Sequence, residues 1–346
     1  MEAILKNREQ FHPGMIKNIR ALQEEFVPKE VVHRDNEIHV LAENLRPTIE
    51  NGKGIDSLLH GPPGTGKTCV SRHLLEKLGQ ENPDVRFHYI NCWKNYSRFK
   101  ILYEALRGIG KTLNVHRQST PTDKLYSVLE ENVERPYVLI LDEFDQIDEE
   151  EALYDLYSLP NVTMILIANH ASALHSLEDR IRSRLMSCER IEFKKYSPDQ
   201  LEDILKKRAE VGLEEEVDDS ILRKIALSSE GDARIAISIL RSSAIKARNK
   251  GKKITKEIVN DCIPEAKKEK KQKDVEKLNS HQKELYRIIN DAGEIKPRDL
   301  YEKYGERVEN PKSERSLRKY LKKMVHYNLI ESEGEGRWRK YRSVES

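Results

Sequence analysis

The chain has 346 residues, of which 37% are hydrophobic and 35% are charged, and its formal net charge at pH 7 is +2. This length allows two or three domains, and no apolar run reaches the roughly 18 residues that cross a bilayer, so we expect a cytoplasmic protein that does not bind membranes. The four cysteines lie far apart, without the spacing of metal ligands or redox pairs, which argues against a zinc site.

Residues 1–50 have a helical pattern, with breaks expected at Pro28 and Pro47. Between 55 and 193, short apolar runs alternate with helical stretches, which indicates an α/β domain with a parallel sheet and helices on both faces. Two of the runs are almost wholly apolar, as strands buried on both faces should be. The predicted strands are IDSLLH (55–60), VRFHYIN (85–91), YVLILD (137–142), VTMILIAN (162–169) and RIEF (190–193).

The segment GPPGTGKT (61–68) follows the first predicted strand and precedes a helical stretch, which is the context of a phosphate-binding loop. Its glycines allow the backbone amides to turn toward phosphate oxygens, and the N-terminus of the following helix adds its dipole. Lys67 supplies a positive charge for the outer phosphates, and Thr68 offers a hydroxyl to Mg²⁺. The predicted phosphate-binding residues are Gly64, Thr65, Gly66, Lys67 and Thr68.

The segment LILDEFDQID (139–148) fits the second half of such a site. Its apolar strand ends in Asp142, which can hold Mg²⁺ through water, and in Glu143, which can orient and polarise an attacking water. Two carboxylates at the end of a parallel strand lie where sheets of this kind bind ligands. We interpret the nearby Asp145 as a helix cap.

Asn169 ends the next predicted strand, and two roles are open for it. Its side chain can hydrogen-bond a γ-phosphate or an attacking water, or it can simply begin a loop. The two preceding motifs favour the first role.

Two later segments make the pattern more specific. DRIRSRL (179–185) is an arginine cluster that follows the strand ending in Asn169, and GDAR (231–234) lies in a helical region. Together with the phosphate loop and the Asp-Glu pair, these segments resemble those of an AAA+ ATPase.

This resemblance implies roles for individual arginines. In the AAA+ family, an arginine after the Asn-bearing strand reaches the nucleotide of a neighbouring subunit, and both Arg180 and Arg184 occupy suitable places, whereas Arg182 also fits a basic helix face. Arg234 would sense the γ-phosphate. That anion would neutralise a cation that is placed unfavourably in the first turn of a helix.

Among AAA+ proteins, the chain resembles the archaeal origin-recognition initiators, which are related to the eukaryotic origin-recognition and cell-division-control helicase loaders. FVPKEVVHRDNEIHVL (26–41) is similar to their N-terminal segment, which packs on adenine, and KKYSPDQLEDILKKRAE (194–210) is similar to their first lid helix. The resemblance implies nucleotide contacts by Val32, His33, Tyr196 and Arg208.

The stretch INCWKNYSRFKILYEALRGIG (90–110) resembles the extra helix with which these initiators touch DNA. This implies Arg98 and Lys100 as DNA contacts. An ordinary packing helix with Leu102 and Leu106 facing inward explains the same stretch, and the sequence leaves both interpretations open.

Residues 266–346 hold 22 Lys and Arg against 15 Asp and Glu, which is typical of a polyanion-binding unit or of an ordinary solvated surface. Residues 311–330 place apolar side chains on one helical face and cations on the others, as a recognition helix does. Residues 329–344 suggest two short strands with a basic tip. We therefore expect a winged helix that binds either DNA or protein, with DNA candidates Arg315, Arg318, Lys319, Lys322, Arg337 and Arg339.

The expected organisation is an AAA+ α/β domain (1–194), a helical lid (195–265), a charged linker (266–278) and a C-terminal winged-helix domain (279–346). We interpret the chain as a DNA replication initiator that binds ATP or ADP with Mg²⁺ and hydrolyses ATP slowly. Expected partners are double-stranded origin DNA, the replicative helicase, and a second initiator copy or paralogue. Two alternatives are a nucleotide-gated DNA-binding regulator with little turnover and a clamp-loader-like ATPase subunit.

Overall fold

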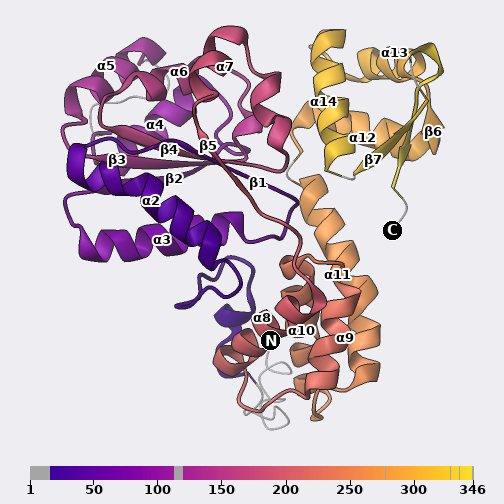
Figure 1. Ribbon diagram of the computed structural model, residues 1–346. Coiled ribbons are helices and arrows are strands. Elements are labelled where there is room, and N and C mark those ends of the chain that lie inside the picture. The colour runs from indigo at the N-terminus through magenta and orange to yellow at the C-terminus, as the bar shows by residue number, and fades with distance from the viewer. Residues whose placement is uncertain (1–15, 113–119, 277, 328, 335, 345–346) are drawn as a thin grey trace, which may run out of the picture. The chain divides into compact units, whose positions relative to one another are not determined.

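A computed structural model of the chain (Figure 1) divides into two compact units, Met1–Val259 and Asn260–Ser346. No helix in the described part of the chain is long and apolar enough to cross a bilayer. The structure describes residues 16–112, 120–276, 278–327, 329–334 and 336–344.

The first unit is built on a sheet of five parallel strands in the spatial order β2-β3-β4-β1-β5. β3 and β4 are buried at every position, which agrees with their almost wholly apolar sequences. All five predicted strands are confirmed, with ends that differ by at most two residues from those expected. The strands are β1 (Ser57–His60), β2 (Arg86–Asn91), β3 (Tyr137–Asp142), β4 (Val162–Ala168) and β5 (Glu189–Glu192).

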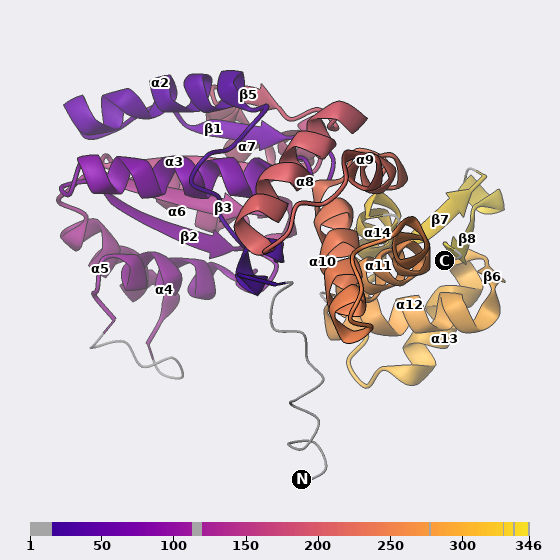
Figure 2. The same ribbon diagram turned by 90° about the horizontal axis from the view of Figure 1, so that it is seen from below.

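Helices cover both faces of this sheet, as Figures 1 and 2 show. Alternate residues of a strand point to opposite faces, so Leu139 and Leu141 pack in one core cluster and Val138 and Ile140 in another. The first cluster includes residues of α4 (Arg98–Gly108), α5 (Thr122–Asn132), α6 (Glu151–Ser158) and α7 (Asp179–Leu185). The second includes residues of α2 (Asp35–Asn51) and α3 (Lys67–Glu81). This confirms the predicted α/β class.

The break expected at Pro47 is wrong, because α2 continues through this residue to Asn51. A proline inside a helix costs about 3 kcal/mol. Leu41 and Leu45 of the same helix are buried against the sheet, and this packing outweighs the local penalty. A short 3-10 helix, η2 (Ile19–Leu22), precedes α2, and residues 1–15 of the predicted helical stretch lie outside the described residues.

Three helices follow the sheet and complete the helical part of the first unit. They are stabilised at their N-termini, because Ser197 and Gln200 form a capping box and Asp218 and Asp232 accept hydrogen bonds from the first turns of their helices. The helices pack on one another, and two of them contact η2. They are α8 (Pro198–Gly212), α9 (Asp219–Ser228) and α10 (Ala233–Asn249).

The next helix, α11 (Lys256–Glu276), begins in the first unit and continues into the second. It includes residues 266–276, which the sequence assigned to a charged linker. Lys, Glu and Gln are good helix formers, so a solvated charged stretch can remain helical without an apolar face.

The second unit contains three further helices and a three-stranded antiparallel sheet of order β6-β8-β7. Two strands were predicted here; the third, β6 (Glu294–Ile295), has only two residues and is too short to give a periodic signal. Val325, on the predicted apolar face of α14, is half-buried. The buried side chains of this unit include Leu285, Ile288, Ile289, Leu300, Tyr304, Leu317, Leu321 and Met324. The remaining elements are α12 (Ser280–Ala292), α13 (Pro297–Arg307), α14 (Glu314–His326), β7 (Ile330–Glu333), η5 (Gly336–Trp338) and β8 (Lys340–Ser343).

Candidate functional site

The strand order brings three predicted site segments to one edge of the sheet. β4 lies between β1 and β3, so the carboxyl ends of these strands are neighbours. The ammonium of Lys67, after β1, donates to Oδ1 of Asn169, after β4, at 3.3 Å. The hydroxyl of Thr68 donates to Oδ2 of Asp142, at the end of β3, at 2.8 Å. The three motifs therefore form a single site.

Glycine is needed in the loop at 61–68 for two reasons: the backbone angles favour glycine, and neighbouring residues leave no space for a Cβ atom. Gly61, Gly64 and Gly66 have φ values of +144°, +74° and +94°, which side chains disfavour. A Cβ atom at Gly64 would lie 1.9 Å from Oδ1 of Asp232, and one at Gly66 would lie 2.6 Å from the hydroxyl of Tyr196. Residues of the helical part thus pack directly on the loop.

Lys67 is folded back onto its own loop. Its ammonium donates to the carbonyl oxygens of Gly61 (2.7 Å) and Pro62 (2.9 Å), and the residue is only 6% exposed. Burial lowers the pKa of Lys67 to about 8, with help from the charge of Arg234 and against the opposing charge of Asp142. Because an anion beside this amine would restore its full charge, the site favours a phosphate-like ligand.

Asp142 accepts two hydrogen bonds through one oxygen. The hydroxyls of Thr68 and Tyr89 each donate to Oδ2 at 2.8 Å. Burial and the charge of Asp142 raise the pKa of Tyr89, so its hydroxyl stays protonated and remains a donor. A hydroxyl beside a carboxylate is a donor set that suits a hard cation such as Mg²⁺, so Thr68 and Asp142 fit their predicted role.

Glu143 follows β3 directly and has a left-handed backbone with φ +57°. Such a conformation costs a non-glycine residue about 1–3 kcal/mol and is frequent at functional sites. Glu143 occupies the N-cap position of the 3-10 helix η3 (Phe144–Gln146), so the expectation that Asp145 caps a helix is wrong, since Asp145 lies inside the first turn. The charge of Glu143 favours the charged forms of Lys67 and Arg234, although burial still lowers the pKa of Lys67.

The first turn of α10 carries Arg234 into the site. Oδ1 of Asp232 accepts hydrogen bonds from the amides of Arg234 (2.9 Å) and Ile235 (3.3 Å), and the amide of Ala233 donates to the carbonyl of Gly64 at 3.0 Å. Burial opposes the charge of Arg234, but neighbouring carboxylates, led by that of Asp232, raise its pKa. They compensate a cation that the helix dipole disfavours.

Arg34 connects the N-terminal segment, the loop and the segment before α8. Its guanidinium donates to the carbonyl of Thr65 (3.0 Å), the hydroxyl of Tyr196 (3.2 Å) and the carbonyl of Lys194 (2.7 Å). The guanidinium also lies 4.1 Å from the centre of the Tyr196 ring and pairs with Glu37. Tyr196, a predicted nucleotide contact, is therefore held at the loop by this arginine.

The structure places Val32 and His33, which were predicted to contact adenine, just before α2. His33 has a left-handed φ of +60°, and its Nε2 lies 2.8 Å from Oδ2 of Asp203 on α8. Val32 is half-buried. The segment is therefore held against the first helix of the helical part.

Arg208, which was predicted to lie near the nucleotide, gives its hydrogen bonds to the segment before α2. It donates to the carbonyls of Ala21 and Phe26, each at 3.0 Å, and its guanidinium lies 4.9 Å from the Phe26 ring centre. Arg208 thus anchors the chain before α2 onto α8, and its charge is near enough to interact with Cys69, the residue after Thr68, and with Tyr196.

Two arginines of the cluster on α7 lie side by side on the same aromatic ring. Arg180 and Arg184 are exposed, and both guanidiniums lie over the ring of Tyr154 on α6, at 4.5 Å and 4.8 Å from its centre. Arg182 pairs with Asp179 of the same helix at 2.5 Å, as expected for a basic helix face. Arg180 and Arg184 therefore share one aromatic support.

The two predicted DNA contacts on α4 differ in their surroundings. Arg98 is bound between Asp155 (2.6 Å) and Asp123 (2.7 Å) and fastens α4 to α6 and α5. Lys100 is exposed, with its ammonium 4.4 Å from the ring centre of Tyr96. Its charge, unlike that of Arg98, is therefore presented to solvent. The inward residues of the alternative interpretation, Leu102 and Leu106, are buried.

In the second unit, the cations predicted for the recognition helix lie on the exposed side of α14. Arg318 pairs with Glu314 at 3.0 Å. Arg339 is exposed just after η5, and the side chain of Arg337 lies outside the described part of the chain. The exposed cations of α14 are Arg315, Arg318, Lys319 and Lys322.

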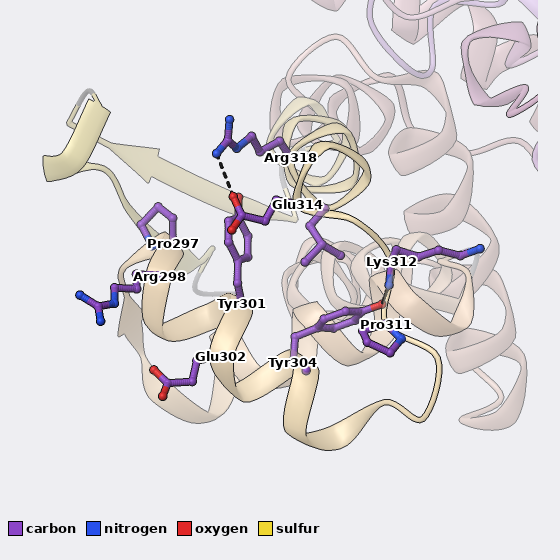
Figure 3. Close-up of a pocket in the computed structure, with 11 residues that line it drawn as sticks. Pro297, Arg298, Tyr301, Glu302, Tyr304, Pro311, Lys312, Glu314 and Arg318 are labelled. Carbon is purple, nitrogen blue, oxygen red and sulfur yellow. Dashed lines mark hydrogen bonds and ion pairs between the residues drawn. The ribbon is translucent and has the colours of Figure 1, made fainter.

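A groove of about 590 Å³ lies between α13 and the start of α14 (Figure 3). Tyr301, Tyr304 and Leu317 line it, and Arg298 and Lys312 extend outward from it. The groove adjoins the exposed cations of α14, because Arg318 belongs to both.

Sequence reasoning missed Tyr89. It did not foresee the contacts of Arg34, which was placed only in the segment that packs on adenine, or the packing of Asp232 on the loop. Residues two apart on a strand point to the same face of the sheet. Tyr89 lies two residues before Asn91, which pairs with Asp142, and this alternation could have indicated Tyr89. Asp232 was assigned only to a helix cap. Arg34 contacts residues about 160 positions away, and no local pattern predicts such a contact.

Comparison with protein families gives two matches. The model described as an AAA domain matches residues 56–177, and the model described as a Cdc6 AAA+ ATPase-type lid domain matches residues 202–268. The first covers the loop and strand motifs, and the second covers most of α8 through α11.

The chain is also similar to known proteins over most of its length. It is 47% identical to the ORC1-type DNA replication protein 1 of Halobacterium salinarum over 88% of this chain and 100% of that protein. It is 42% identical to the ORC1-type DNA replication protein 9 of the same organism, over 96% of this chain and 95% of that protein. In structure it resembles the Aeropyrum pernix ORC1 protein solved in complex with DNA, with a TM-score of 0.75 and 24% identity over 96% of this chain and 93% of that one.

The packing of Asp232 on the loop predicts the effect of Gly64→Ala. The added Cβ would displace the Asp232 carboxylate, and the loss of a helix cap costs about 0.5–2 kcal/mol. The amides of Arg234 and Ile235 should then exchange hydrogen about tenfold faster by NMR or mass spectrometry. Gly110→Ala is the matched control, since Gly110 has the same φ of +74° and nothing within 4 Å of its added Cβ. Equal effects of the two changes on these amides would contradict the prediction.

Proposed function

Because the chain belongs to the family of ORC1-type DNA replication proteins, we propose that it is an ATP-dependent initiator that binds origin DNA and helps to load the replicative helicase. The observation that carries the nucleotide part is the convergence of a buried lysine, a hydroxyl, two carboxylates and an amide at the carboxyl ends of β1, β3 and β4. Slow ATP hydrolysis acts as a switch.

The phosphates of ATP or ADP are held by the loop amides and by Lys67, which exchanges its contacts with loop carbonyls for contacts with phosphate oxygens. Thr68 and Asp142 hold Mg²⁺, which would supply a positive charge that stabilises the phosphates during transfer. Glu143 orients the attacking water and accepts its proton, while Asn169 and Arg234 contact the γ-phosphate. The adenine binds beside the segment that contains Val32 and His33.

In this proposal, hydrolysis by a single copy is slow because the exposed arginines of α7 act on the nucleotide of another copy rather than on their own. Arg180 and Arg184 are exposed and can be offered to the nucleotide of a second initiator copy or of a paralogue. Such an arginine increases turnover by about 10³–10⁵ in related phosphoryl transfers.

The second unit is proposed to be a winged helix that holds duplex DNA. In this proposal, α14 lies in the major groove of the DNA and presents its exposed cations there. The turn between β7 and β8, with Arg337 and Arg339, contacts the phosphate backbone of the DNA. Lys100 of α4 adds a contact from the first unit. Two observations support this assignment: the basic surplus of residues 266–346, and the fold shared with an ORC1 protein that was solved in complex with DNA.

The lowered pKa of Lys67 predicts how ATP affinity depends on pH. Below about pH 8 Lys67 is already charged, so affinity should be constant. Above it, binding must first return a proton to the amine, since phosphates favour the charged form. The dissociation constant, measured by calorimetry from pH 7.5 to 9.5, should then rise by up to about tenfold per pH unit. Lys67→Arg, which stays charged, should show no such rise, and a flat wild-type profile would argue against this role of Lys67.

Glu143→Gln tests the hydrolytic role. The amide cannot accept a proton from water, so phosphate release should fall by about 100-fold or more, while ATP affinity stays within about threefold. Release should be followed over hours, with and without duplex DNA, because the wild-type rate is itself low. Hydrolysis at the wild-type rate by the variant would refute the role of Glu143. A wild-type protein that binds ATP and DNA but releases no phosphate would favour the regulator alternative.

Changing Arg315, Lys319 and Arg337 together to Ala tests the DNA-binding surface. Each phosphate contact contributes about −0.9 to the slope of log affinity against log salt concentration, so the slope should flatten by about three in a filter-binding or anisotropy assay. Lys250, Lys252 and Lys253, which are exposed after α10, provide a control of equal charge change when replaced by Ala. If both triple variants bind duplex DNA with the wild-type slope, the second unit is not the reader.

A further inference from the structure

Tyr89 lies on β2, the edge strand next to β3, and its hydroxyl reaches across to the carboxylate that ends β3. It donates to Oδ2 of Asp142 at 2.8 Å, and the hydroxyl of Thr68 donates to that same oxygen at 2.8 Å. The two donors come from different elements, β2 and α3. Their common target fixes the rotation of the Asp142 carboxylate from two sides.

Both of these hydrogen bonds end on Oδ2 of Asp142, and neither ends on its second oxygen, Oδ1. An ionised carboxylate has about four acceptor positions, so Oδ1 can still accept hydrogen bonds from other groups while Oδ2 is occupied. The hydroxyl of Tyr89 therefore determines which oxygen of Asp142 is presented to a ligand.

The ring of Tyr89 is itself held in place. The guanidinium of Arg72 on α3 lies 4.7 Å from the centre of the ring. Because α3 also carries Thr68, one helix supports both donors to Oδ2. A phenol fixed in this way loses little freedom when it orients a neighbouring carboxylate.

We propose that Tyr89 is a positioning residue for Mg²⁺: it fixes the orientation of the Asp142 carboxylate that would hold the ion accompanying the nucleotide. This rests on the proposed function, since it assumes that Asp142 and Thr68 hold the metal. Residues that orient metal ligands typically change metal affinity by about 10–100-fold when they are altered.

The test is Tyr89→Phe, which removes the hydroxyl but keeps the ring and its contact with Arg72. Binding of a non-hydrolysable ATP analogue is measured by calorimetry in EDTA and then across a magnesium titration. We expect the half-saturating magnesium concentration to rise by about tenfold or more, with metal-free affinity unchanged within about twofold. Tyr126→Phe is the matched control, because Tyr126 donates to Glu130 at 3.1 Å on α5, away from the site.

A double-mutant cycle with Asp142→Asn separates positioning from a general effect on the fold. If Tyr89 acts through the Asp142 carboxylate, its replacement should change magnesium dependence little once that carboxylate is gone. Additive effects of the two changes would overturn the proposal. It also fails if Tyr89→Phe keeps the wild-type magnesium midpoint, or if it weakens binding equally with and without magnesium, since the role of Tyr89 would then be structural. A wild-type protein whose binding ignores magnesium would instead refute the metal role in the proposed function.

Discussion

The contact between the phosphate loop and the start of α10 constrains the whole site. The amide of Ala233 donates to the carbonyl of Gly64, and the carboxylate of Asp232 fills the space where Gly64 lacks a Cβ atom. That carboxylate also caps α10, so the same side chain that defines the start of the helix fixes its distance from the loop. Arg234 follows two residues later, and its backbone amide is held by the Asp232 carboxylate. A single close approach of backbone to carboxylate thus decides where a cation of the helical part meets the end of the sheet.

Charge balance follows from this geometry. Lys67 is buried, Arg234 is half-buried, and each is near Asp142, Glu143 and Asp232, so two cations share the field of three carboxylates. Lys67 nevertheless has a lowered pKa, because desolvation and the second cation outweigh the carboxylates, whereas the balance at Arg234 raises its pKa. A polyphosphate ligand would add negative charge beside Lys67, whose charged form is disfavoured by burial and by Arg234. The site is therefore arranged so that the charge of the ligand, rather than that of the protein, completes the stabilisation of Lys67.

Much of this architecture could be predicted because it depends on local patterns. The apolar runs predicted all five strands of the parallel sheet, and the placement of Lys67, Thr68, Asp142 and Asn169 after strands followed from their spacing. Features that depend on contacts distant in the chain could not be predicted. Proline penalties predicted a break at Pro47, but burial of the same helix against the sheet prevented it. β6 was missed because a strand of two residues is too short to show an alternating pattern. Tyr89 was missed because its place beside Asp142 depends on the order of the strands in the sheet, which local sequence does not give.

The arginines show most clearly why residue type alone did not assign roles. A guanidinium has five donors and is always charged, so when it is enclosed by protein it must find acceptors there, and those acceptors decide what it does. Arg34 finds the carbonyls of Thr65 and Lys194, Arg98 finds two carboxylates, and Arg208 finds two carbonyls before α2. Each of these three arginines holds elements of the first unit together. Arg180 and Arg184 instead rest on the aromatic ring of Tyr154, and Arg184 also donates a hydrogen bond to the Tyr154 hydroxyl. Exposed guanidinium donors are what recognition of an external anion requires, and this is the physical reason for assigning the role in a second copy to this pair.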